Sequence, residues 1–347
     1  MNPGRPFGVN GRPRAFFTTR GDDDMKLNTK HIARSIAGAL ALTSAFAALA
    51  QSAPWYPSKF GAKDEIGAAN YLTPAIALQA AKLVKTGKVY SLGITVNTTT
   101  PAFPPRTCSI YIVQPGQVGA ATGLGNTNTT YNDDILNCWN GIGTQIDGLG
   151  HIGVGDRYYN GMKWADIATI GGMKKLGADT VPPMVARGVL LDMAAHFGVD
   201  VVKEGTAFNQ AEIDAVAKKQ GVEIRQGDVV IFHTGWLSLI EKDPKRYGSV
   251  EPGLGREGAR YLVSKGVVAV GADTWGLEVI PFEKKGAEDG GVFEVHQILL
   301  PMSGTYILEN INTAELAKDK AWEFMFVLGQ NKYQGSVQSM INPIAIR

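Results

Sequence analysis

Short apolar runs that alternate with amphipathic stretches constrain the fold of this 347-residue chain more than any other feature of its sequence. Apolar runs of four or five residues are typical of buried strands, and they lie at Gly188–Asp192, Val229–Phe232 and Val267–Val270. Stretches with helical periodicity lie at Gln210–Gln220, Arg256–Lys265 and Thr313–Phe324. Strands that alternate with helices predict an α/β sheet protein. Because no linker-like segment or internal repeat interrupts residues 51–347, we expect them to form one domain.

The region before these runs predicts one more helix, one more strand and a long loop segment. Thr73 is a candidate N-cap before a proline and an apolar helical pattern over residues 75–84. Val89–Val96 is strand-like. Residues 98–140 are rich in Thr, Asn, Pro and Gly, which predicts loops around a binding site. Candidates for such a rim are Phe103, Arg106 and Tyr111.

The N-terminus has the features of an export signal. Residues 25–34 are positively charged, residues 36–47 are mostly apolar, and Ala48-Leu49-Ala50 is a small-x-small cleavage site. The apolar stretch is shorter than the roughly 20 residues that span a bilayer, so a membrane anchor is the weaker interpretation. We therefore predict a signal peptide at residues 25–50 and a periplasmic or secreted protein. Residues 1–24 precede a second start at Met25 and are interpreted as an over-extended start or a cloning remnant.

Cys108 and Cys138 are the only cysteines. In an exported protein such a pair predicts a disulfide, and the alternative is a pair of buried free thiols. A metal site at these cysteines is not expected, because no zinc-ligand spacing surrounds them.

The charge of the chain gives no reason to expect a nucleic-acid partner. The first 50 residues hold seven Lys/Arg and three Asp/Glu, which leaves 27 basic and 29 acidic residues after them. A body this close to neutral, without a basic stripe, lacks the electrostatic footprint of nucleic-acid binding.

The segment Gly141–Gly153 carries the densest chemical signal in the sequence. Its five glycines allow sharp turns and a close approach of the backbone to a ligand. In an extended chain Gln145, Asp147 and His151 fall on one face, because side chains alternate with a period of two. An amide, a carboxylate and an imidazole on one face could hold a metal or share a proton. The alternative is structural, with the Asp capping a turn and the His simply hydrogen-bonded.

This segment resembles the signature of the metal-dependent cyclase family, which includes kynurenine formamidase and isatin hydrolase, His-x-Gly-Thr-His-x-Asp-x-Pro-x-His. Gly143-Thr144, Asp147 and His151 stand at matching positions. Further blocks resemble the family in the same order along the chain; they are Arg187–Asp192, Gly227–Trp236, Val270–Asp273, Val295–Leu300 and Tyr306–Ile311. The resemblance implies a single α/β domain of the swivelling β/β/α type.

The chain departs from the signature at two histidines, which fall on Gly141 and Gln145, and at the proline, which falls on Leu149. The resemblance therefore implies that one of two possible metal sites is depleted. A second remains complete, with Asp147, His296 and Glu309 as its ligands. A branch of the family carries Gln at the second His position, so Gln145 is a further candidate ligand, or a donor to an oxyanion. We expect one divalent metal, Mn or Zn, and His151 as the catalytic base.

By this resemblance the protein is an enzyme, a metal-dependent hydrolase of a small amide, formamide or cyclic amide. A lactone or ester hydrolase with the same site is one alternative, and a metal-poor periplasmic binding protein is another. We expect a small-molecule substrate, no nucleic acid, no membrane anchor, and a homo-oligomer, either a dimer or a tetramer.

Five other residues are weaker candidates. His233 ends a predicted strand, where ligand sites collect in α/β proteins, but it could equally be a packing residue. His196 carries no motif and is interpreted as structural. Trp275 could line a pocket for a planar substrate or lie in the core. Trp55-Tyr56 is a candidate for covering the site of a neighbouring subunit.

Overall fold

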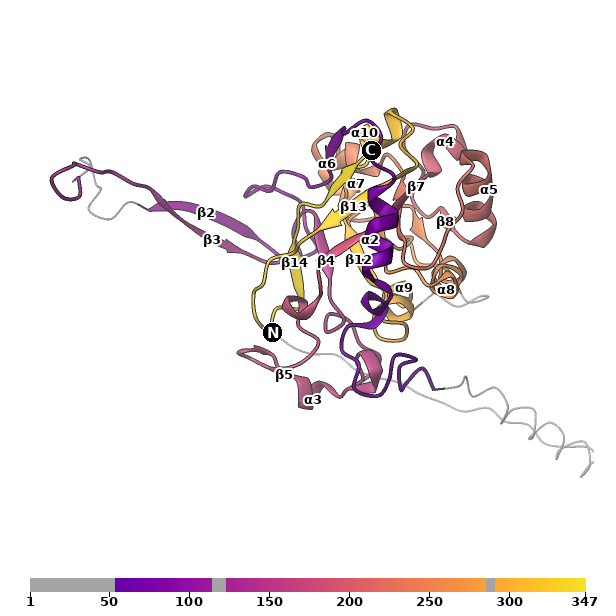
Figure 1. Cartoon of the computed structure of the whole chain (residues 1–347), viewed down its shortest axis with the longest axis horizontal. Helices are drawn as coiled ribbons and strands as arrows, with labels where there is room; N and C mark the ends of the chain where they lie inside the picture. Colours follow the sequence, from indigo (N-terminus) through magenta and orange to yellow (C-terminus); the bar gives the residue numbers. More distant parts are fainter. Residues whose placement is uncertain (1–53, 114–122, 285–290) are drawn as a thin grey trace, which may run out of the picture. The chain divides into compact units, whose positions relative to one another are not determined.

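A mixed β-sheet forms the centre of the domain (Figure 1). The computed structural model describes residues 54–113, 123–284 and 291–347. Within them the largest sheet has nine strands, in the order β1 (Val89–Ser91), β15 (Ile344–Ile346), β13 (Glu323–Leu328), β7 (Met184–Asp192), β9 (Val229–His233), β11 (Ala269–Ala272), β12 (Tyr306–Glu309), β4 (Gln145–Asp147) and β14 (Gln338–Met340). The four strands from β7 to β12 are parallel to one another, and the flanking pairs are antiparallel. The predicted α/β single domain is confirmed.

Helices connect the parallel strands and cover the sheet. Their bounds are α2 Pro74–Ala81, α3 Trp164–Ile167, α4 Met193–Phe197, α5 Gln210–Gln220, α6 Leu239–Lys242, α7 Pro244–Tyr247, α8 Arg256–Lys265, α9 Glu294–Leu299 and α10 Ala314–Lys318. The α5 helix begins at a capping box, in which Asn209 and Glu212 each bond the other's backbone N–H, and it ends at a left-handed Gly221. Helix α8 packs against both α5 and α9, and α2 packs on β7 and β13.

The predicted elements agree with the structure where apolar residues recur with a clear helical or strand periodicity. The helices α5 and α8 have the predicted bounds, and Thr73 caps α2 by accepting from the Ile76 N–H. The predicted helix Thr313–Phe324 is wrong in its second half, because the chain leaves α10 at Lys318 and enters β13. Alternate residues of β13 are buried, as expected of a strand. Because β13 follows the short helix α10 closely, the two patterns merge in the sequence and resemble one longer helix.

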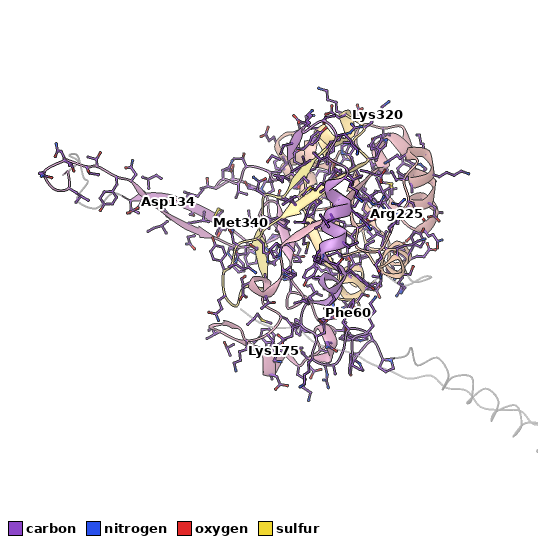
Figure 2. All side chains as sticks on the ribbon, viewed as in Figure 1. Phe60, Asp134, Lys175, Arg225, Lys320 and Met340 are labelled. Atoms are coloured by element: carbon purple, nitrogen blue, oxygen red, sulfur yellow. A yellow bond between two sulfur atoms is a disulfide. The ribbon has the colours of Figure 1, made fainter. Side chains whose placement is uncertain are left out.

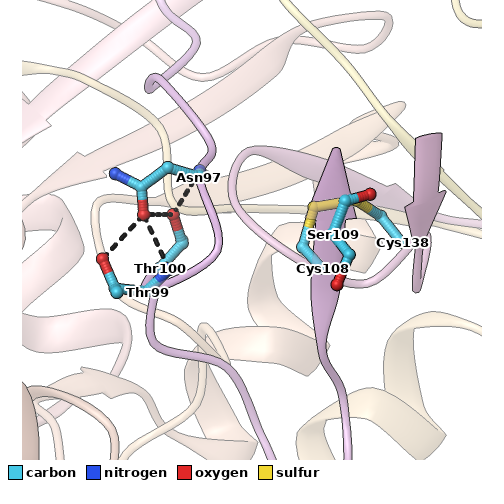
Figure 3. The surroundings of a disulfide bond; sticks show 6 residues. All are labelled: Asn97, Thr99, Thr100, Cys108, Ser109 and Cys138. Carbon is cyan, nitrogen blue, oxygen red and sulfur yellow. Dashed lines mark hydrogen bonds between the residues drawn. A yellow bond between two sulfur atoms is a disulfide. The ribbon is translucent and has the colours of Figure 1, made fainter. Parts of the chain in front are cut away.

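The region 98–140 is not only loop. Two strands, β2 (Cys108–Val113) and β3 (Asp133–Cys138), pair antiparallel and form a ribbon of their own. Cys108 and Cys138 lie opposite each other at its base and are joined by a disulfide (Figure 3). The predicted disulfide is therefore confirmed.

Three minor features complete the fold. The short pairs β5 (Ala168–Thr169) with β6 (Gly172–Met173), and β8 (Ala207–Phe208) with β10 (Gly253–Leu254), lie outside the main sheet. Short 3-10 helices occur at Gly67–Tyr71, Tyr159–Gly161, Ala178–Thr180 and Trp236–Ser238. No helix among residues 54–113, 123–284 and 291–347 has the length and apolar character of a membrane span. The predicted signal peptide lies outside the described residues.

Candidate metal centre

Four polar side chains meet at β4 because of the strand register. Gln145 lies opposite Glu309 of β12, and Asp147 lies opposite Gln338 of β14. Cross-strand partners share a face of the sheet, and so do residues two apart on one strand. The side chain of Ile146, between them, is fully buried in the hydrophobic core. The register therefore gathers two carboxylates and two amides from three strands in one buried place.

His296 joins this group from α9. Its Nε2 lies 3.3 Å from Glu309 Oε1 and 3.8 Å from Asp147 Oδ2. Its other ring nitrogen, Nδ1, lies 3.3 Å from Glu278 Oε2, which also accepts from the backbone N–H groups of Val295 and His296. Glu278 therefore anchors the start of α9 and fixes the direction in which Nε2 points, as carboxylates commonly do for metal-binding histidines.

The predicted ligand set Asp147, His296 and Glu309 is brought together, with one ligand atom from each residue within 4.8 Å of the others. Asp147 Oδ2 is buried and has no hydrogen-bond donor. A buried carboxylate oxygen without a donor is costly unless a cation faces it. These residues therefore fit a divalent metal, and the mixed set of one imidazole and two carboxylates suits either Zn²⁺ or Mn²⁺.

The electrostatics of the group point the same way. Burial, and after it the neighbouring Asp147 carboxylate, raise the pKa of Glu309 to about 7. Burial opposes protonation of His296, but Glu278 and Glu309 at its two ring nitrogens raise its pKa well above the ordinary value. Both shifts express an excess of buried negative charge. A divalent cation would neutralise that charge and hold the carboxylates ionised and the imidazole neutral.

Gln145 bridges the two carboxylate ligands. Its Nε2 donates to Glu309 Oε2 at 2.6 Å and lies 3.3 Å from Asp147 Oδ1. Its Oε1 is buried without a donor. In this arrangement the amide N–H groups orient the carboxylates, and the amide oxygen remains available to a cation or to a donor on a substrate.

His151 stands at the wall of the same site. The chain turns after β4, where the His151 N–H donates to Gly148 O, so His151 does not continue the strand. Its Nε2 is 3.9 Å from Asp147 Oδ2, and 17% of its side chain is exposed. Burial lowers the pKa of His151, although the Asp147 carboxylate opposes the shift. A neutral imidazole beside the ligand set can accept a proton.

Arg106 occupies the space beside Gly141, where the family signature has its first histidine. A Cβ at position 141 would lie 2.6 Å from Arg106 Nη1 and 2.8 Å from Gln338 Oε1. The guanidinium also donates to Gly141 O at 2.9 Å. The first of the two metal sites implied by the resemblance is thus replaced here by a cation that belongs to the protein.

A cavity of about 140 Å³ leads to the group; it is lined by Phe103, Arg106, His151, Ile152, Trp275, Gly276, Phe293, His296 and Glu309. The rings of Phe103 and Trp275 stack at 5.6 Å and 26°, and Phe293 meets Phe103 edge-on. The indole Nε1 of Trp275 is buried without an acceptor. The cavity therefore combines flat apolar walls with two of the candidate metal ligands.

The structure also places the weaker candidates. Trp275, Phe103 and Arg106 line the cavity, whereas Tyr111 lies on the β2–β3 ribbon. His233 is elsewhere, with Nδ1 bonded to Thr313 Oγ1 at 2.7 Å beside Asp273. His196 lies on α4, and Trp55 packs edge-on against Tyr56, whose ring lies against Gly161 of the same chain.

Three residues of the site were not predicted from the sequence, namely Glu278, Phe293 and Gln338. Glu278 and Phe293 lie in irregular segments on either side of residues 285–290, where no period marks them. Gln338 is on a three-residue strand and donates to Asp147 Oδ1 at 2.7 Å. The pairing of β14 with β4 reveals it, and sequence spacing does not.

Replacing Glu278 with Gln tests the anchoring of His296. The neutral amide cannot accept from the two backbone N–H groups and the imidazole as a carboxylate does, so we expect metal affinity to fall about 10–100-fold. Metal titration followed by calorimetry measures this. Glu257→Gln, on the first turn of α8, is the control. Unchanged metal affinity in Glu278→Gln would show that packing alone holds α9.

The family model described as Cyclase matches residues 90–279. No curated protein matches the chain in sequence. Among solved structures, one described as a novel cyclase is 29% identical, with a TM-score of 0.74 over 84% of this chain and 98% of that one.

Two further structures share the fold at lower identity. Isatin hydrolase A from Ralstonia solanacearum is 18% identical, with a TM-score of 0.55 over 79% of this chain and 97% of that chain. An isatin hydrolase bound to the product analogue thioisatinate is also 18% identical, with a TM-score of 0.56 over 79% and 98% of the two chains.

Proposed function

Since this chain belongs to the Cyclase family, we propose that it is a metal-dependent hydrolase of a carbon–nitrogen bond in a small, flat amide, formamide or cyclic amide. The observation that carries the proposal is the buried cluster of Asp147, His296 and Glu309 at the end of an aromatic cavity. A divalent cation held by these residues would supply Lewis acidity to the scissile carbonyl and would acidify water.

The walls of the cavity select and orient the substrate. The stacked rings of Phe103 and Trp275 favour a planar group, because aromatic faces pack best against flat partners. The small volume of the cavity, about 140 Å³, favours a substrate of one or two rings over a peptide.

His151 handles the proton of the reaction. Its Nε2 removes a proton from the attacking water as the new carbon–oxygen bond forms, and it returns that proton to the nitrogen as the carbon–nitrogen bond breaks. The products are an amine and a carboxylic acid, which then loses its proton to water. The Gln145 amide, which bridges Glu309 and Asp147, keeps both carboxylates directed at the reacting centre.

Arg106 is suited to the negative charge that develops in this reaction. Its guanidinium lines the cavity and is held by Gly141 O, so it can stabilise an oxyanion or the product carboxylate. Gly141→Ala tests this role, because the added methyl group would displace the guanidinium. We expect kcat/KM to fall on the order of 10-fold or more with little change in melting temperature. Gly329→Ala, where a Cβ meets nothing within 4 Å, is the matched control.

The decisive assay combines metal content with turnover. The purified chain is analysed for Mn and Zn and then assayed with an N-formyl arylamine, isatin and an aromatic lactone. Hydrolysis of either nitrogen substrate in proportion to bound metal supports the proposal. Turnover of the lactone alone would favour the ester-hydrolase alternative. Binding of these compounds without turnover, in a protein that takes up no metal, would favour the periplasmic binding protein.

The predicted export of the protein belongs to the same proposal. The Cys108–Cys138 disulfide supports it, because disulfides persist in oxidising compartments. An exported enzyme of this kind would meet its substrate in the periplasm or outside the cell.

A further inference from the structure

Arg106 is a half-buried cation that has no carboxylate partner among the described residues. A guanidinium has five N–H donors, and this one makes a single hydrogen bond to the described part of the chain, from Nη1 to Gly141 O at 2.9 Å. Its other nitrogens are not enclosed by protein, so they are open to the cavity or to solvent. Arginines that leave water are usually paired with an acid. The unused donors of Arg106 therefore indicate a partner outside the chain.

Two other half-buried arginines of the domain show what Arg106 lacks. The guanidinium of Arg187 donates to both Asp228 and Glu323. Arg256 likewise lies beside two glutamates. In this fold a guanidinium that leaves the surface is thus neutralised by carboxylates, and Arg106 is an exception to that pattern.

This unpaired guanidinium lies at the candidate metal centre. It lines the same cavity as His151 and Glu309. Burial lowers the pKa of His151, and the charge of Arg106 adds to that fall, so the charge acts within reach of the reacting groups. Figure 2 shows the labelled Met340, the last residue of β14, where the β2–β3 ribbon joins the body of the domain; Arg106 precedes that ribbon in the chain. The cation therefore borders the space that a substrate would occupy.

The charges around the cavity favour an anion once a divalent cation is bound. Asp147 and Glu309 carry two negative charges, which balance those of the ion. The third acid of the region, Glu278, lies on the Nδ1 side of His296 and accepts from the N–H groups at the start of α9. The positive charge of Arg106 is then unbalanced at the surface of the cavity. A negatively charged group on the ligand would balance it.

The shape of the cavity selects a carboxylate among small anions. A planar guanidinium matches the two oxygens of a carboxylate with two parallel hydrogen bonds. The rings of Phe103 and Trp275, stacked at 5.6 Å, give the cavity flat walls. A carboxylate can lie in the plane of an aromatic ring, whereas the oxygens of a sulfonate or a phosphate project out of that plane. A flat anion therefore fits this space better than a tetrahedral one.

We propose that the substrate of this chain carries a carboxylate on its flat ring, and that Arg106 binds this carboxylate while the candidate metal centre acts on the amide. The inference rests on the proposed hydrolase function and narrows its substrate class to anionic aromatic amides and formamides. Arg106 is then a residue that determines specificity, and its effect depends on the charge of the substrate. Stabilisation of an oxyanion would instead act alike on charged and neutral substrates.

Paired substrates separate these two roles. The metal-loaded chain is assayed with formanilide, which is neutral, and with the three isomers of formamidobenzoate. We expect kcat/KM for the best isomer to exceed that for formanilide about 10–100-fold, the usual effect of charge-assisted hydrogen bonds. The corresponding formamidobenzenesulfonates should lose most of this preference. A sulfonate preferred over the carboxylate would overturn the choice of anion.

Two variants of Arg106 and one control make the assignment specific. Arg106→Gln removes the charge and should abolish the preference for the carboxylate. Arg106→Lys keeps the charge but not the paired donors, so it should retain only a small part of the preference. Arg157→Gln is the matched control and should keep all of it, because Arg157 Nη1 also donates to a glycine carbonyl, Gly161 O at 2.8 Å, but does not line the cavity. Melting temperatures show whether each variant is folded.

Binding of unreactive ligands provides a test that needs no turnover. Calorimetry compares benzoate with nitrobenzene, its uncharged analogue of the same shape, in the presence and absence of added Zn²⁺. We expect benzoate to bind about 10-fold or more tightly than nitrobenzene when Zn²⁺ is present, and this advantage should be lost in Arg106→Gln. A benzoate held by the metal alone would keep its advantage in the variant, which would overturn the proposal.

The outcomes distinguish this inference from the proposed function. Equal kcat/KM for formanilide and every formamidobenzoate, or a preference that persists in Arg106→Gln, would overturn the inference and leave the hydrolase function standing. If the metal-loaded chain hydrolyses neither these formamides nor isatin, the proposed function fails. The comparison of benzoate with nitrobenzene then decides by itself whether Arg106 binds a carboxylate.

Discussion

Replacing Asp147 with Asn is expected to remove the metal and to lower kcat/KM by on the order of 10³-fold. The change keeps the shape of the side chain and the oxygen that accepts from Gln338, but it removes the charge that faces the candidate metal position. Lewis-acid activation contributes several kcal/mol to such reactions, and each 1.4 kcal/mol is a factor of ten. His296→Ala should give the same result. Elemental analysis and steady-state kinetics measure both effects.

Thermal melting separates loss of the metal from loss of the fold. A ligand that binds only the native state stabilises it, so a chelator should lower the melting temperature of the unaltered protein and leave that of Asp147→Asn unchanged. In the metal-free state the variant should be the more stable of the two, because one of two adjacent buried carboxylates is gone. Asp156→Asn, at an exposed ion pair, is the control. Metal content and turnover equal to those of the unaltered protein would remove Asp147 from the site.

Replacing His151 with Ala is expected to lower kcat by about 10²–10⁴-fold, the usual contribution of a positioned general base. The metal should be retained, because Asp147, His296 and Glu309 form the ligand set without His151. Added imidazole should restore part of the activity by entering the space that the side chain leaves. His196→Ala, on α4, is the matched control and should be fully active. A loss of metal equal to the loss of activity would instead make His151 a ligand.

The contrast between Asp147 and Gln338 shows how much of this site could be predicted. The blocks that resemble the family motif contain Asp147, His296 and Glu309, so the sequence alone was enough to predict this ligand set. Gln338 is 191 residues from Asp147 along the chain and occupies a strand of three residues. Its role exists only because β14 pairs with β4 in a particular register, and register in a mixed sheet is set by long-range packing.

The β2–β3 ribbon is a second case in which strand pairing could not be predicted from the sequence. A composition rich in Thr, Asn, Pro and Gly predicted loops for residues 98–140, and the cysteine pair predicted the disulfide that the structure contains. The apolar residues on either side of those polar stretches were too few to indicate a strand pair by period alone. The two strands form because they pair with each other, and local propensity did not predict them, because strand preference depends strongly on context.

The sequence by itself determined the α/β class, the position of the best-patterned helices, the disulfide and the three candidate ligands. These features depend on local periodicity, on the chemistry of exported cysteines or on a motif, all of which are readable in one dimension. Tertiary structure decided that Arg106 fills the space beside Gly141, that Glu278 fixes His296, and that β2 and β3 pair in a ribbon of their own. Each of these depends on which residues, distant in the sequence, become neighbours in the fold. Burial in a low-dielectric interior then strengthens the electrostatic interactions between those neighbours.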